Sequence, residues 1–315
     1  MTEAVVAVTA GDPSGIGPEI ILKAIRAIPR SARLGLLVIG DREVFAKTAK
    51  RLRLKPPPVF MDCGRPSAFP LGRTSAAAGR ASLGYLDHAV ALWRSKRIQA
   101  LVTAPVTKWA IGRVEPSFVG QTEYLARAMG SREVVMMFVS DRLRVALLTR
   151  HVPLARVASA INQTVLRRAL RLTAKGLTAY FGIQHPRLAL CGLNPHAGEE
   201  ARCGKEERAV MLPVLRSLRA QGLVCDGPFA ADGFFAAHRD GYDAVVCAYH
   251  DQGLIPFKMV ARDRGCQLSV GLPIPRTSPD HGSALDIAGQ GIADPGSMIY
   301  AIRLAIRLAC SPSRH

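Results

Sequence analysis

The chain has 315 residues, of which 49% are hydrophobic and 21% charged, as is typical of a globular protein with a large core. Its 42 Lys and Arg against 24 Asp and Glu give a formal net charge of +18. The basic residues form no five-residue block and are accompanied by no zinc-finger spacing or RNA-binding aromatic motif, so the pattern disfavours a nucleic-acid partner.

The first residues and the cysteines indicate the compartment. The segment MTEAVVAVTAGDPSG has no basic leader with a long apolar stretch, and later apolar runs such as LGLLVIG are too short to cross a bilayer. Seven scattered cysteines contain no C-x-x-C pair that would indicate redox or zinc chemistry. We therefore expect a cytoplasmic protein with reduced cysteines and no membrane partner.

Short apolar runs alternate with longer segments of helical periodicity along the chain. Strands are expected at residues 5–9, 34–39, 100–102, 134–138, 145–148, 188–191 and 244–248. Helices are expected at residues 18–27, 75–97, 122–129, 165–180, 206–221 and 295–309. This order is typical of parallel strands joined by helical crossovers, so the predicted fold class is α/β.

A glycine-rich turn, GDPSGIGPE at residues 11–19, lies between the first expected strand and helix. It lacks the G-x-G-x-x-G order of a dinucleotide loop and the G-K-[ST] of a Walker loop. Two interpretations are open: a structural turn, or an active-site loop that presents Asp12.

Three histidines, His151, His196 and His250, each follow an apolar, strand-like run and lie in a polar or glycine-containing turn. Ligands bind at the carboxyl ends of the strands in an open parallel sheet, so these side chains are candidates to converge there. Neutral imidazoles suit Zn²⁺, Co²⁺, Ni²⁺ or Fe²⁺, and three protein ligands leave positions for substrate oxygens. Each histidine alone is more often a loop or cap residue than a ligand.

Two further features suggest a ligand. Residues 272–297, LPIPRTSPDHGSALDIAGQGIADPGS, combine Arg276, Asp280, His281 and Asp286 with repeated glycines that allow a close approach to a bound molecule. Lys258 adds a cation near His250 that suits a carboxylate or phosphate, although most lysines simply lie at the surface.

Several blocks together resemble the 4-hydroxythreonine-4-phosphate dehydrogenase family of vitamin B6 biosynthesis. They are AGDPSGIGPEI, TAPVTK, LNPHAGE, YHDQGLIPFK and RTSPDHGSALDIAG, and they occur in the family's order almost from end to end. The resemblance implies a homodimer of two-lobed α/β/α subunits, similar in fold to isocitrate and isopropylmalate dehydrogenases, with the active site in the cleft between lobes. The first lobe would comprise residues 1–120 plus 275–315, and the second, with the metal site and dimer contacts, residues 121–274.

The resemblance also implies roles for individual residues. His151, His196 and His250 fall on positions that bind one divalent metal ion (Zn, Co or Mg). Substrate would be bound by Gln121, Thr122, Lys258, Gln267 and Arg276. The cofactor, NAD or NADP, would contact His281, Gly282, Ser283, Ala284 and Asp286.

Two positions depart from the family pattern. The family usually has G-H-T-E where this chain has GQTE, so Gln121 can donate a hydrogen bond but cannot carry a charge. Gln267 replaces an Asn that usually precedes the Arg276 loop. Relatives act on phosphorylated erythronate or threonate, and a distant branch oxidises the cis-dihydrodiol of terephthalate, so these remain alternative substrates.

The expected reaction is oxidation of 4-phosphohydroxy-L-threonine followed by decarboxylation to 3-amino-2-oxopropyl phosphate. Asp232 and Asp251 are both candidates for the base that takes the hydroxyl proton, or for partners that orient the metal-binding imidazoles. Two other hypotheses are an isopropylmalate or isocitrate dehydrogenase, which would hold Mg²⁺ or Mn²⁺ through aspartates, and a basic RNA-binding protein without NAD binding.

Overall fold

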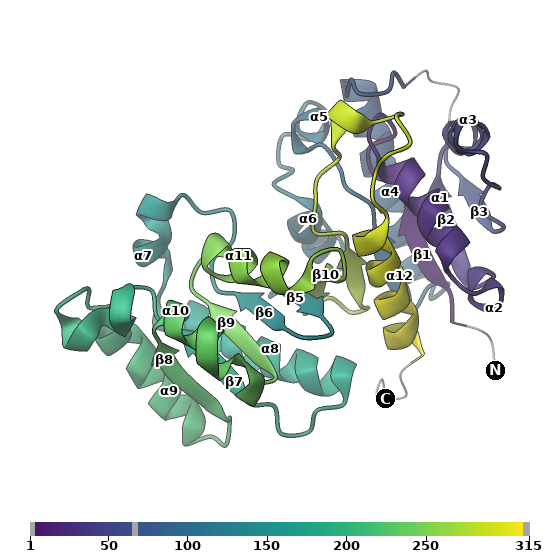
Figure 1. The fold of residues 1–315 in the computed structure, drawn as a ribbon. Helices are drawn as coiled ribbons and strands as arrows, with labels where there is room; N and C mark the ends of the chain where they lie inside the picture. The colour runs from purple at the N-terminus through teal and green to yellow at the C-terminus, as the bar shows by residue number, and fades with distance from the viewer. Residues whose placement is uncertain (1–3, 65–68, 311–315) are drawn as a thin grey trace. The chain divides into compact units, whose positions relative to one another are not determined.

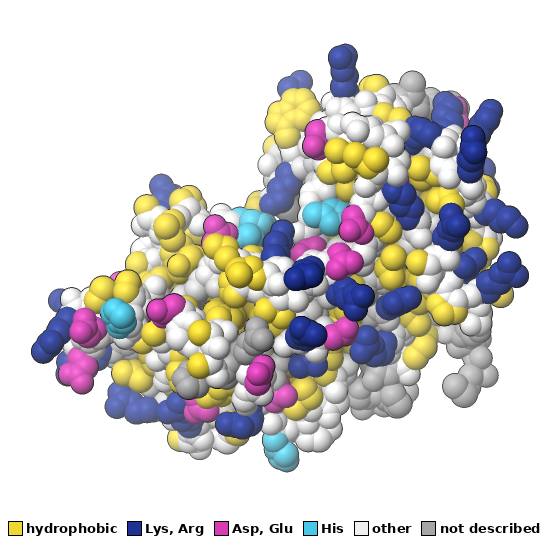
Figure 2. All heavy atoms as spheres, viewed as in Figure 1, with side chains coloured by type: hydrophobic (Ala, Val, Ile, Leu, Met, Phe, Trp, Pro, Cys, Tyr) yellow, Lys and Arg dark blue, Asp and Glu magenta, His cyan; other side chains and the backbone are white. Residues whose placement is uncertain are grey.

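The computed structural model describes residues 4–64 and 69–310 (Figure 1). Contacts divide this part of the chain into two compact units. The first unit comprises residues up to 132 together with 263–268 and 272–310, and the second comprises residues 133–262 and 269–271. No helix in the described residues is long and apolar enough to cross a membrane. Lys and Arg side chains are visible on both units in Figure 2.

A parallel sheet forms the centre of the first unit, with neighbouring strands in the order β3-β2-β1-β4-β11. Its strands are β1 (Val6–Thr9), β2 (Leu36–Gly40), β3 (Phe60–Asp62), β4 (Ala100–Thr103) and β11 (Arg276–Ser278). Its helices are α1 (Gly17–Ala27), α2 (Arg30–Arg33), α3 (Arg42–Leu52), α4 (Ala76–Arg94), α5 (Lys108–Gly112), α6 (Gln121–Ala128), η6 (Leu285–Ile287) and α12 (Gly296–Ala309).

The first unit's sheet is buried because its central strands are apolar on both faces. All four residues of β1 and of β4 are buried, as expected for parallel strands with helices packed against them. Helix α12 packs against α1, β4 and β11, and the amphipathic α1 packs against α3. These contacts fix the turns at the carboxyl ends of the strands, where the candidate site residues lie.

The second unit contains five neighbouring strands in the order β5-β6-β9-β7-β8. Its strands are β5 (Val135–Ser140), β6 (Arg144–Leu147), β7 (Leu188–Cys191), β8 (Cys225–Phe229) and β9 (Ala244–Cys247). Its helices and short helical turns are η1 (Leu154–Arg156), α7 (Val157–Ala160), α8 (Gln163–Phe181), η2 (Pro195–Ala201), η3 (Glu207–Met211), α9 (Leu212–Arg219), α10 (Ala231–Gly233), η4 (Phe234–His238), η5 (Arg239–Gly241) and α11 (His250–Ala261). Strand β10 (Gly265–Val270) begins in the first unit and ends in the second.

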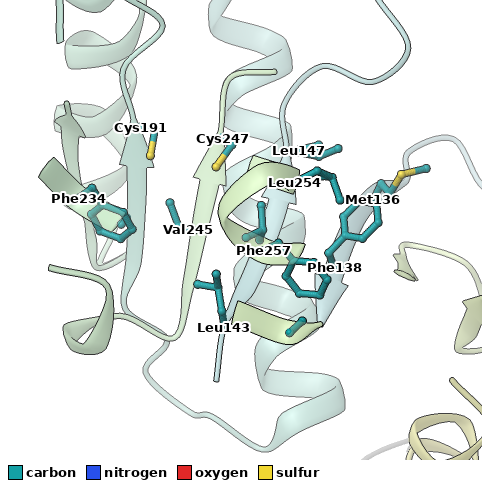
Figure 3. Close-up of a cluster of buried hydrophobic side chains, with 13 residues drawn as sticks. Met136, Phe138, Leu143, Leu147, Cys191, Phe234, Val245, Cys247, Leu254 and Phe257 are labelled. Atoms are coloured by element: carbon teal, nitrogen blue, oxygen red, sulfur yellow. The ribbon is translucent and has the colours of Figure 1, made fainter. Parts of the chain in front are cut away.

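The core of the second unit forms between α11 and the strands β5, β6, β7 and β9 (Figure 3). Phe138 and Phe257 lie with ring centroids 5.6 Å apart. Gly253, the fourth residue of α11, lets that helix approach the sheet closely, since a Cβ there would meet a methyl group of Val145 at 2.6 Å. The core therefore fixes α11, whose first residue is His250.

The α/β class and every strand and helix expected above are confirmed, with shifted ends. The expectation of uniformly parallel strands is wrong for β5, which runs antiparallel to β6 across a short turn. The two units also divide at different points from the predicted lobes, because residues 121–132 and 263–268 belong to the first unit. Helix α6 lies there because it packs against α4, and Arg94 donates a hydrogen bond to the carbonyl of Ala128.

Candidate active site

The three candidate metal ligands follow three neighbouring parallel strands of the second unit. Strand β9 lies between β6 and β7, with Leu147 opposite Cys247 and Leu190 opposite Val246. His151 follows β6, His250 follows β9 and His196 follows β7. All three histidines therefore leave the same edge of one sheet, as the sequence suggested. His250 differs from the expected turn setting in that it begins helix α11.

Two of the three imidazoles lie close together. The ring centroids of His151 and His250 are 6.3 Å apart, and all three histidine side chains are exposed. Within residues 4–64 and 69–310, no group of three or more His, Cys, Asp or Glu side chains is gathered tightly enough to bind a metal ion. The three-histidine ligand set accordingly stays a prediction.

Backbone strain marks the segments that carry His151 and His196. His151 has φ +42° and His196 has φ +52°, and positive φ values continue from His196 through Ala201. Residues with a Cβ rarely adopt this conformation, because the Cβ approaches the following carbonyl oxygen. The turn η2 is held in place partly by Asn194, which donates hydrogen bonds to Glu206 and Glu207.

The two candidate catalytic carboxylates differ in their surroundings. The Asp251 carboxylate lies 2.6 Å from Nδ1 of His250, and both side chains are largely exposed. Asp232 is exposed in the short helix α10, which packs against η2. A carboxylate on Nδ1 directs the other ring nitrogen, Nε2, toward a metal, and this is the usual arrangement around metal-binding histidines. The contact with Asp251 thus leaves Nε2 of His250 as the nitrogen that could bind a metal.

Arg276 organises the candidate anion site in the first unit. Its side chain is only 2% exposed, and Nε donates to Oγ1 of Thr103 at 3.0 Å while Nη1 donates to Oγ1 of Thr122 at 3.2 Å. Nη1 also donates to Oε1 of Gln267, which accepts a further hydrogen bond from the hydroxyl of Ser278. The structure thus brings Thr122, Gln267 and Arg276 together and adds Thr103, while their role in binding substrate stays a prediction.

The charge of Arg276 is maintained despite its burial. Burial lowers the pKa of this guanidinium to about 10, and the nearby carboxylate of Glu123 raises it in part. Arg276 therefore remains cationic at neutral pH. A buried, oriented guanidinium is a donor group that suits a phosphate or carboxylate.

Gln121 lies beside this cluster, at the start of α6. Its Nε2 donates to the carbonyl of Ala104 at 3.2 Å, whereas its buried Oε1 has no hydrogen-bond partner in the part of the chain that the structure describes. Lys258 belongs to the other unit, where it is exposed near the end of α11.

The predicted cofactor loop packs against the glycine-rich turn. The carbonyl of Ser283 accepts a hydrogen bond from the backbone N–H of Ile16 at 3.0 Å, and its hydroxyl lies 2.9 Å from Oγ1 of Thr107. A Cβ on Gly15 would meet the Ser283 carbonyl at 2.7 Å, so this position requires glycine. Nε2 of His281 is buried without a hydrogen-bond partner among the described residues, which fits a loop that receives a polar ligand.

Asp12 is structural rather than presented to a ligand. Its side chain is fully buried, and its two carboxylate oxygens accept hydrogen bonds from the N–H of Ser14 at 2.9 Å and the hydroxyl of Thr74 at 2.7 Å. The turn at residues 11–17 therefore shapes the surface on which the Ser283 loop rests.

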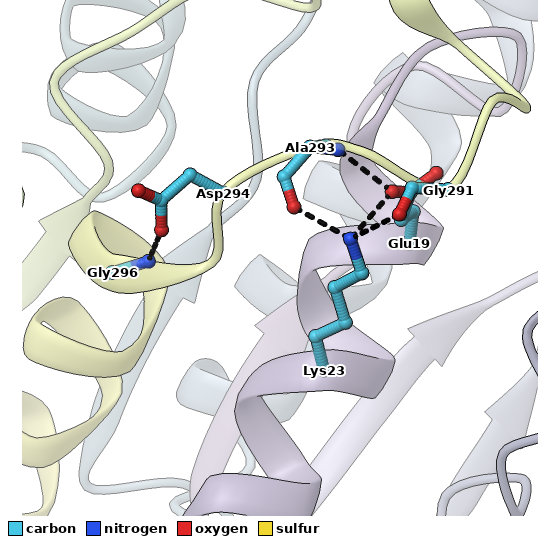
Figure 4. Close-up of polar contacts among 6 residues, drawn as sticks. All are labelled: Glu19, Lys23, Gly291, Ala293, Asp294 and Gly296. Atoms are coloured by element: carbon cyan, nitrogen blue, oxygen red, sulfur yellow. Dashed lines mark hydrogen bonds and ion pairs between the residues drawn. The ribbon is translucent and has the colours of Figure 1, made fainter.

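The far end of the cofactor loop is fixed by a partly buried ion pair on α1 (Figure 4). Nζ of Lys23 lies 2.8 Å from Oε1 of Glu19 and donates to the carbonyls of Gly291 and Ala293. The same Glu19 oxygen accepts the N–H of Ala293 at 2.9 Å. The sequence analysis did not predict these contacts, although Lys23 lies four residues after Glu19, which is the spacing of a helical ion pair.

Comparisons with known proteins agree on one family. Residues 32–305 match the family described as pyridoxal phosphate biosynthetic protein PdxA. The chain is 41% identical to the 4-hydroxythreonine-4-phosphate dehydrogenase of Desulforapulum autotrophicum, with 96% of this chain and 94% of that one covered. The solved structure of the enzyme of that name from Klebsiella pneumoniae superposes with a TM-score of 0.86 at 31% identity, covering 98% and 99% of the two chains.

A differently named relative is also similar. The terephthalate 1,2-cis-dihydrodiol dehydrogenase of Burkholderia xenovorans is 33% identical, with a TM-score of 0.66 and coverage of 97% of this chain and 98% of that one. The comparisons therefore include two kinds of substrate, one phosphorylated and one not.

Proposed function

Because this chain belongs to the PdxA family of pyridoxal phosphate biosynthetic proteins, we propose that it oxidises 4-phosphohydroxy-L-threonine with NAD or NADP and decarboxylates the product to 3-amino-2-oxopropyl phosphate. The observation that carries the choice of a phosphorylated substrate is the buried, charged Arg276 in its frame of hydroxyl and amide oxygens. Its guanidinium is a planar, permanently charged donor group, and such a group suits a phosphate.

In this proposal the first unit supplies most of the anion site. Arg276 presents its guanidinium to the substrate phosphate, and the hydroxyls of Thr103 and Thr122 hold the plane of that guanidinium. Gln121 adds an uncharged donor beside it, and Lys258 supplies a second positive charge. Binding the phosphate at a fixed place orients the reacting hydroxyl, which lowers the entropic cost of the reaction.

The second unit supplies the proton chemistry and the metal ligands. We assign His151, His196 and His250 to one divalent ion, which supplies Lewis acidity toward the substrate oxygens, while the nicotinamide supplies the hydride acceptor. Asp251 orients His250 through its 2.6 Å contact with Nδ1. Asp232 and Asp251 are the candidates to take the proton of the hydroxyl, since both carboxylates lie beside the turns that carry the histidines.

Oxidation leaves a ketone β to the substrate carboxylate, and this arrangement explains the second step. The carbon–carbon bond to the carboxylate breaks, CO₂ leaves, and the electron pair becomes an enolate that a proton then quenches. Groups that stabilise negative charge on the carbonyl oxygen accelerate this loss. No further cofactor is needed, because the ketone itself accepts the electrons.

We further propose that the active protein is a cytoplasmic homodimer whose partner subunit completes each site. This proposal follows from the family resemblance alone. Analytical ultracentrifugation combined with assays at nanomolar concentration tests it, and a fully active monomer would refute it.

A second candidate function is oxidation of a carboxylated, non-phosphorylated dihydrodiol. It is favoured by Gln121, which lacks the charge of the histidine usual at that position, and by the 33% identity to the terephthalate dihydrodiol dehydrogenase. A carboxylate carries less charge than a phosphate, so fewer cations are needed to bind it.

The deciding experiment is a screen for NADH and NADPH formation. Phosphohydroxythreonine, phosphoerythronate and the terephthalate dihydrodiol are each assayed with Zn²⁺, Co²⁺ and Mg²⁺. We expect phosphohydroxythreonine to give the highest kcat/KM with release of CO₂. Turnover of the dihydrodiol alone would replace the first proposal with the second, and turnover of phosphoerythronate alone would leave the chemistry but change the substrate.

A further inference from the structure

A cavity lies in the first unit, away from the residues of the proposed active site. Its volume is about 700 Å³, within the usual range for small-molecule sites. It is bounded by the end of α1, by the segment around α2, and by the chain that joins α3 to β3. None of these segments belongs to the proposed active site.

The cavity lies at the opposite edge of the sheet from the cofactor loop. Its lining residues 30–34 precede β2 and residues 53–58 precede β3, so they lie at the amino ends of these parallel strands. The cofactor loop packs instead against Ile16 and Thr107, in segments that follow the carboxyl ends of β1 and β4. The strands themselves separate the two places.

The charges around the cavity are all of one sign. Of the described residues that line it, five are basic and none is acidic: Arg26, Arg30, Arg33, Arg53 and Lys55. Figure 2 shows dark blue side chains gathered over α1, α2 and α3, the elements that border this cavity. Several cations facing one concave surface attract a multiply charged anion, because a cavity focuses the field of its walls.

One of these cations is held in position by the backbone. Nε of Arg33 donates to the carbonyl of Ile28 at 2.8 Å, and its Nη2 donates to the carbonyl of Arg26 at 2.9 Å. A guanidinium fixed in this way loses little freedom when it binds an anion.

Arg53 occupies a position where glycine is the usual residue. It ends α3 with φ +53° and ψ +40°, the left-handed conformation that disfavours residues with a Cβ. The backbone N–H of Arg53 donates to Lys50 and that of Leu54 to Ala49, so the turn itself does not require the arginine side chain. The strained residue at this turn is thus a cation that lines the cavity.

The remaining wall is apolar. The lining includes Leu22, Ile25, Leu34, Leu54, Pro56 and Pro58. Leu34 is 65% exposed, which is high for a large aliphatic side chain and indicates a surface that a ligand's apolar part can cover. The ligand that fits is therefore both polyanionic and partly apolar.

We propose that this cavity binds a nucleoside triphosphate, with the phosphates against the arginines and the base against the leucines and prolines. A monophosphate ester would leave most of the cations unused, and inorganic tripolyphosphate would leave the apolar wall uncovered. The site is independent of the proposed dehydrogenase chemistry.

The test is calorimetric titration of the full chain with ATP, AMP and tripolyphosphate at about 0.15 M salt, where exposed charges are largely screened. We expect ATP to bind at least tenfold more tightly than either other probe. Arg30→Ala and Arg53→Gly should each weaken ATP binding by about tenfold or more, since each removes charge-assisted hydrogen bonds. Arg53→Gly is the sharper variant, because glycine relieves the backbone strain, so a lost fold cannot explain lost binding.

Two controls make the outcome decisive. Arg171→Ala removes one exposed positive charge from α8 of the other unit and should leave ATP binding unchanged. Asp286→Ala, in the cofactor loop, should also leave it unchanged. Equal weakening by Arg171→Ala would mean diffuse surface attraction, and loss in Asp286→Ala would place ATP in the cofactor loop. Either result, or no ATP binding below millimolar concentration, overturns the proposal.

Discussion

Lys23 and Glu19 form an ion pair within helix α1 and also form hydrogen bonds with residues 291–293, which are distant in the sequence. Glu19 is 2% exposed, and its Oε1 accepts both the ammonium of Lys23 and the N–H of Ala293. The ammonium in turn donates to two carbonyls of residues 291–293. One charged pair thus joins α1 to the segment that follows the predicted cofactor loop.

We expect Lys23→Met to lower stability by about 2 kcal/mol, because the buried Glu19 carboxylate loses its cation and two carbonyls lose their donor. It should also weaken dinucleotide binding, since the loop at residues 281–289 loses its anchor. Thermal unfolding and NADH titration measure the two effects.

The matched control is Lys47→Met on α3. Lys47 forms the same i,i+4 pair with Glu43, but both side chains are exposed. An exposed pair contributes well under 1 kcal/mol, so this variant should differ little from the native chain. If both variants lose the same stability and NADH affinity, then the burial and the loop contacts of Lys23 do not contribute to either.

The second prediction concerns the metal. His151→Ala, His196→Ala and His250→Ala should each remove bound Zn²⁺ or Co²⁺ and abolish turnover, because each would delete one of the three proposed ligands. Metal content is measured by elemental analysis, with circular dichroism as the check on folding. His88→Ala on α4 is the control, since that ring contacts a carbonyl of its own helix. Full metal content in His196→Ala would refute the assignment.

The third prediction concerns pH and Asp41, which is 7% exposed at the start of α3. Burial raises the pKa of this carboxyl above 3.8, and the nearby Asp62 raises it further, while the hydrogen bond from Tyr85 lowers it. Because the folded pKa exceeds the unfolded one, the stability that Asp41 contributes is full below pH 3.8 and is lost as pH rises through the folded value.

Asp41→Asn should therefore gain stability relative to the native chain as pH rises from about 3.5 to 7, because the amide never becomes charged. Unfolding temperatures of both proteins across this range provide the measurement. A difference that stays constant with pH would show that Asp41 does not titrate in this way.

Much of the fold is predictable because long segments with a regular hydrophobic pattern can be assigned to helices or strands from the sequence. Helices α4 and α8 and the apolar strands β1 and β7 follow from periodicity and from uniformly apolar runs. Helix α11 does not, because Gly253 and Pro256 lie inside it and both disfavour a helix. Packing against the sheet outweighs that local preference, since only glycine fits beside Val145.

The candidate site likewise contains residues that the sequence predicted and residues that it did not. The strand ends predicted where His151, His196 and His250 lie, after three neighbouring parallel strands, whereas their convergence on one metal ion stays a prediction. The hydrogen-bond partners of Arg276 were harder to predict from the sequence. Strand β11 has only three residues and includes this buried charge, so it shows no apolar pattern. Thr103 was missed because its role appears only when β4 and β11 pair.

The last prediction concerns the choice between phosphate and carboxylate substrates. Arg276→Lys keeps the charge but loses the planar fork, and it cannot satisfy Thr103 and Gln267 with the same geometry. We expect the KM for phosphohydroxythreonine to rise about 100-fold, with a smaller change in kcat, since the lost contacts bind the anion in both ground and transition states. Gln121→His should be tolerated and should tighten binding below about pH 6.5, where an imidazole becomes cationic. Steady-state kinetics of both variants from mildly acidic to neutral pH, with unfolding temperatures to confirm the fold, provide the measurement. If Gln121→His abolishes activity toward the phosphorylated substrate while Arg276→Lys behaves as the native chain, the anion site is misplaced and the dihydrodiol branch becomes the better account of this protein.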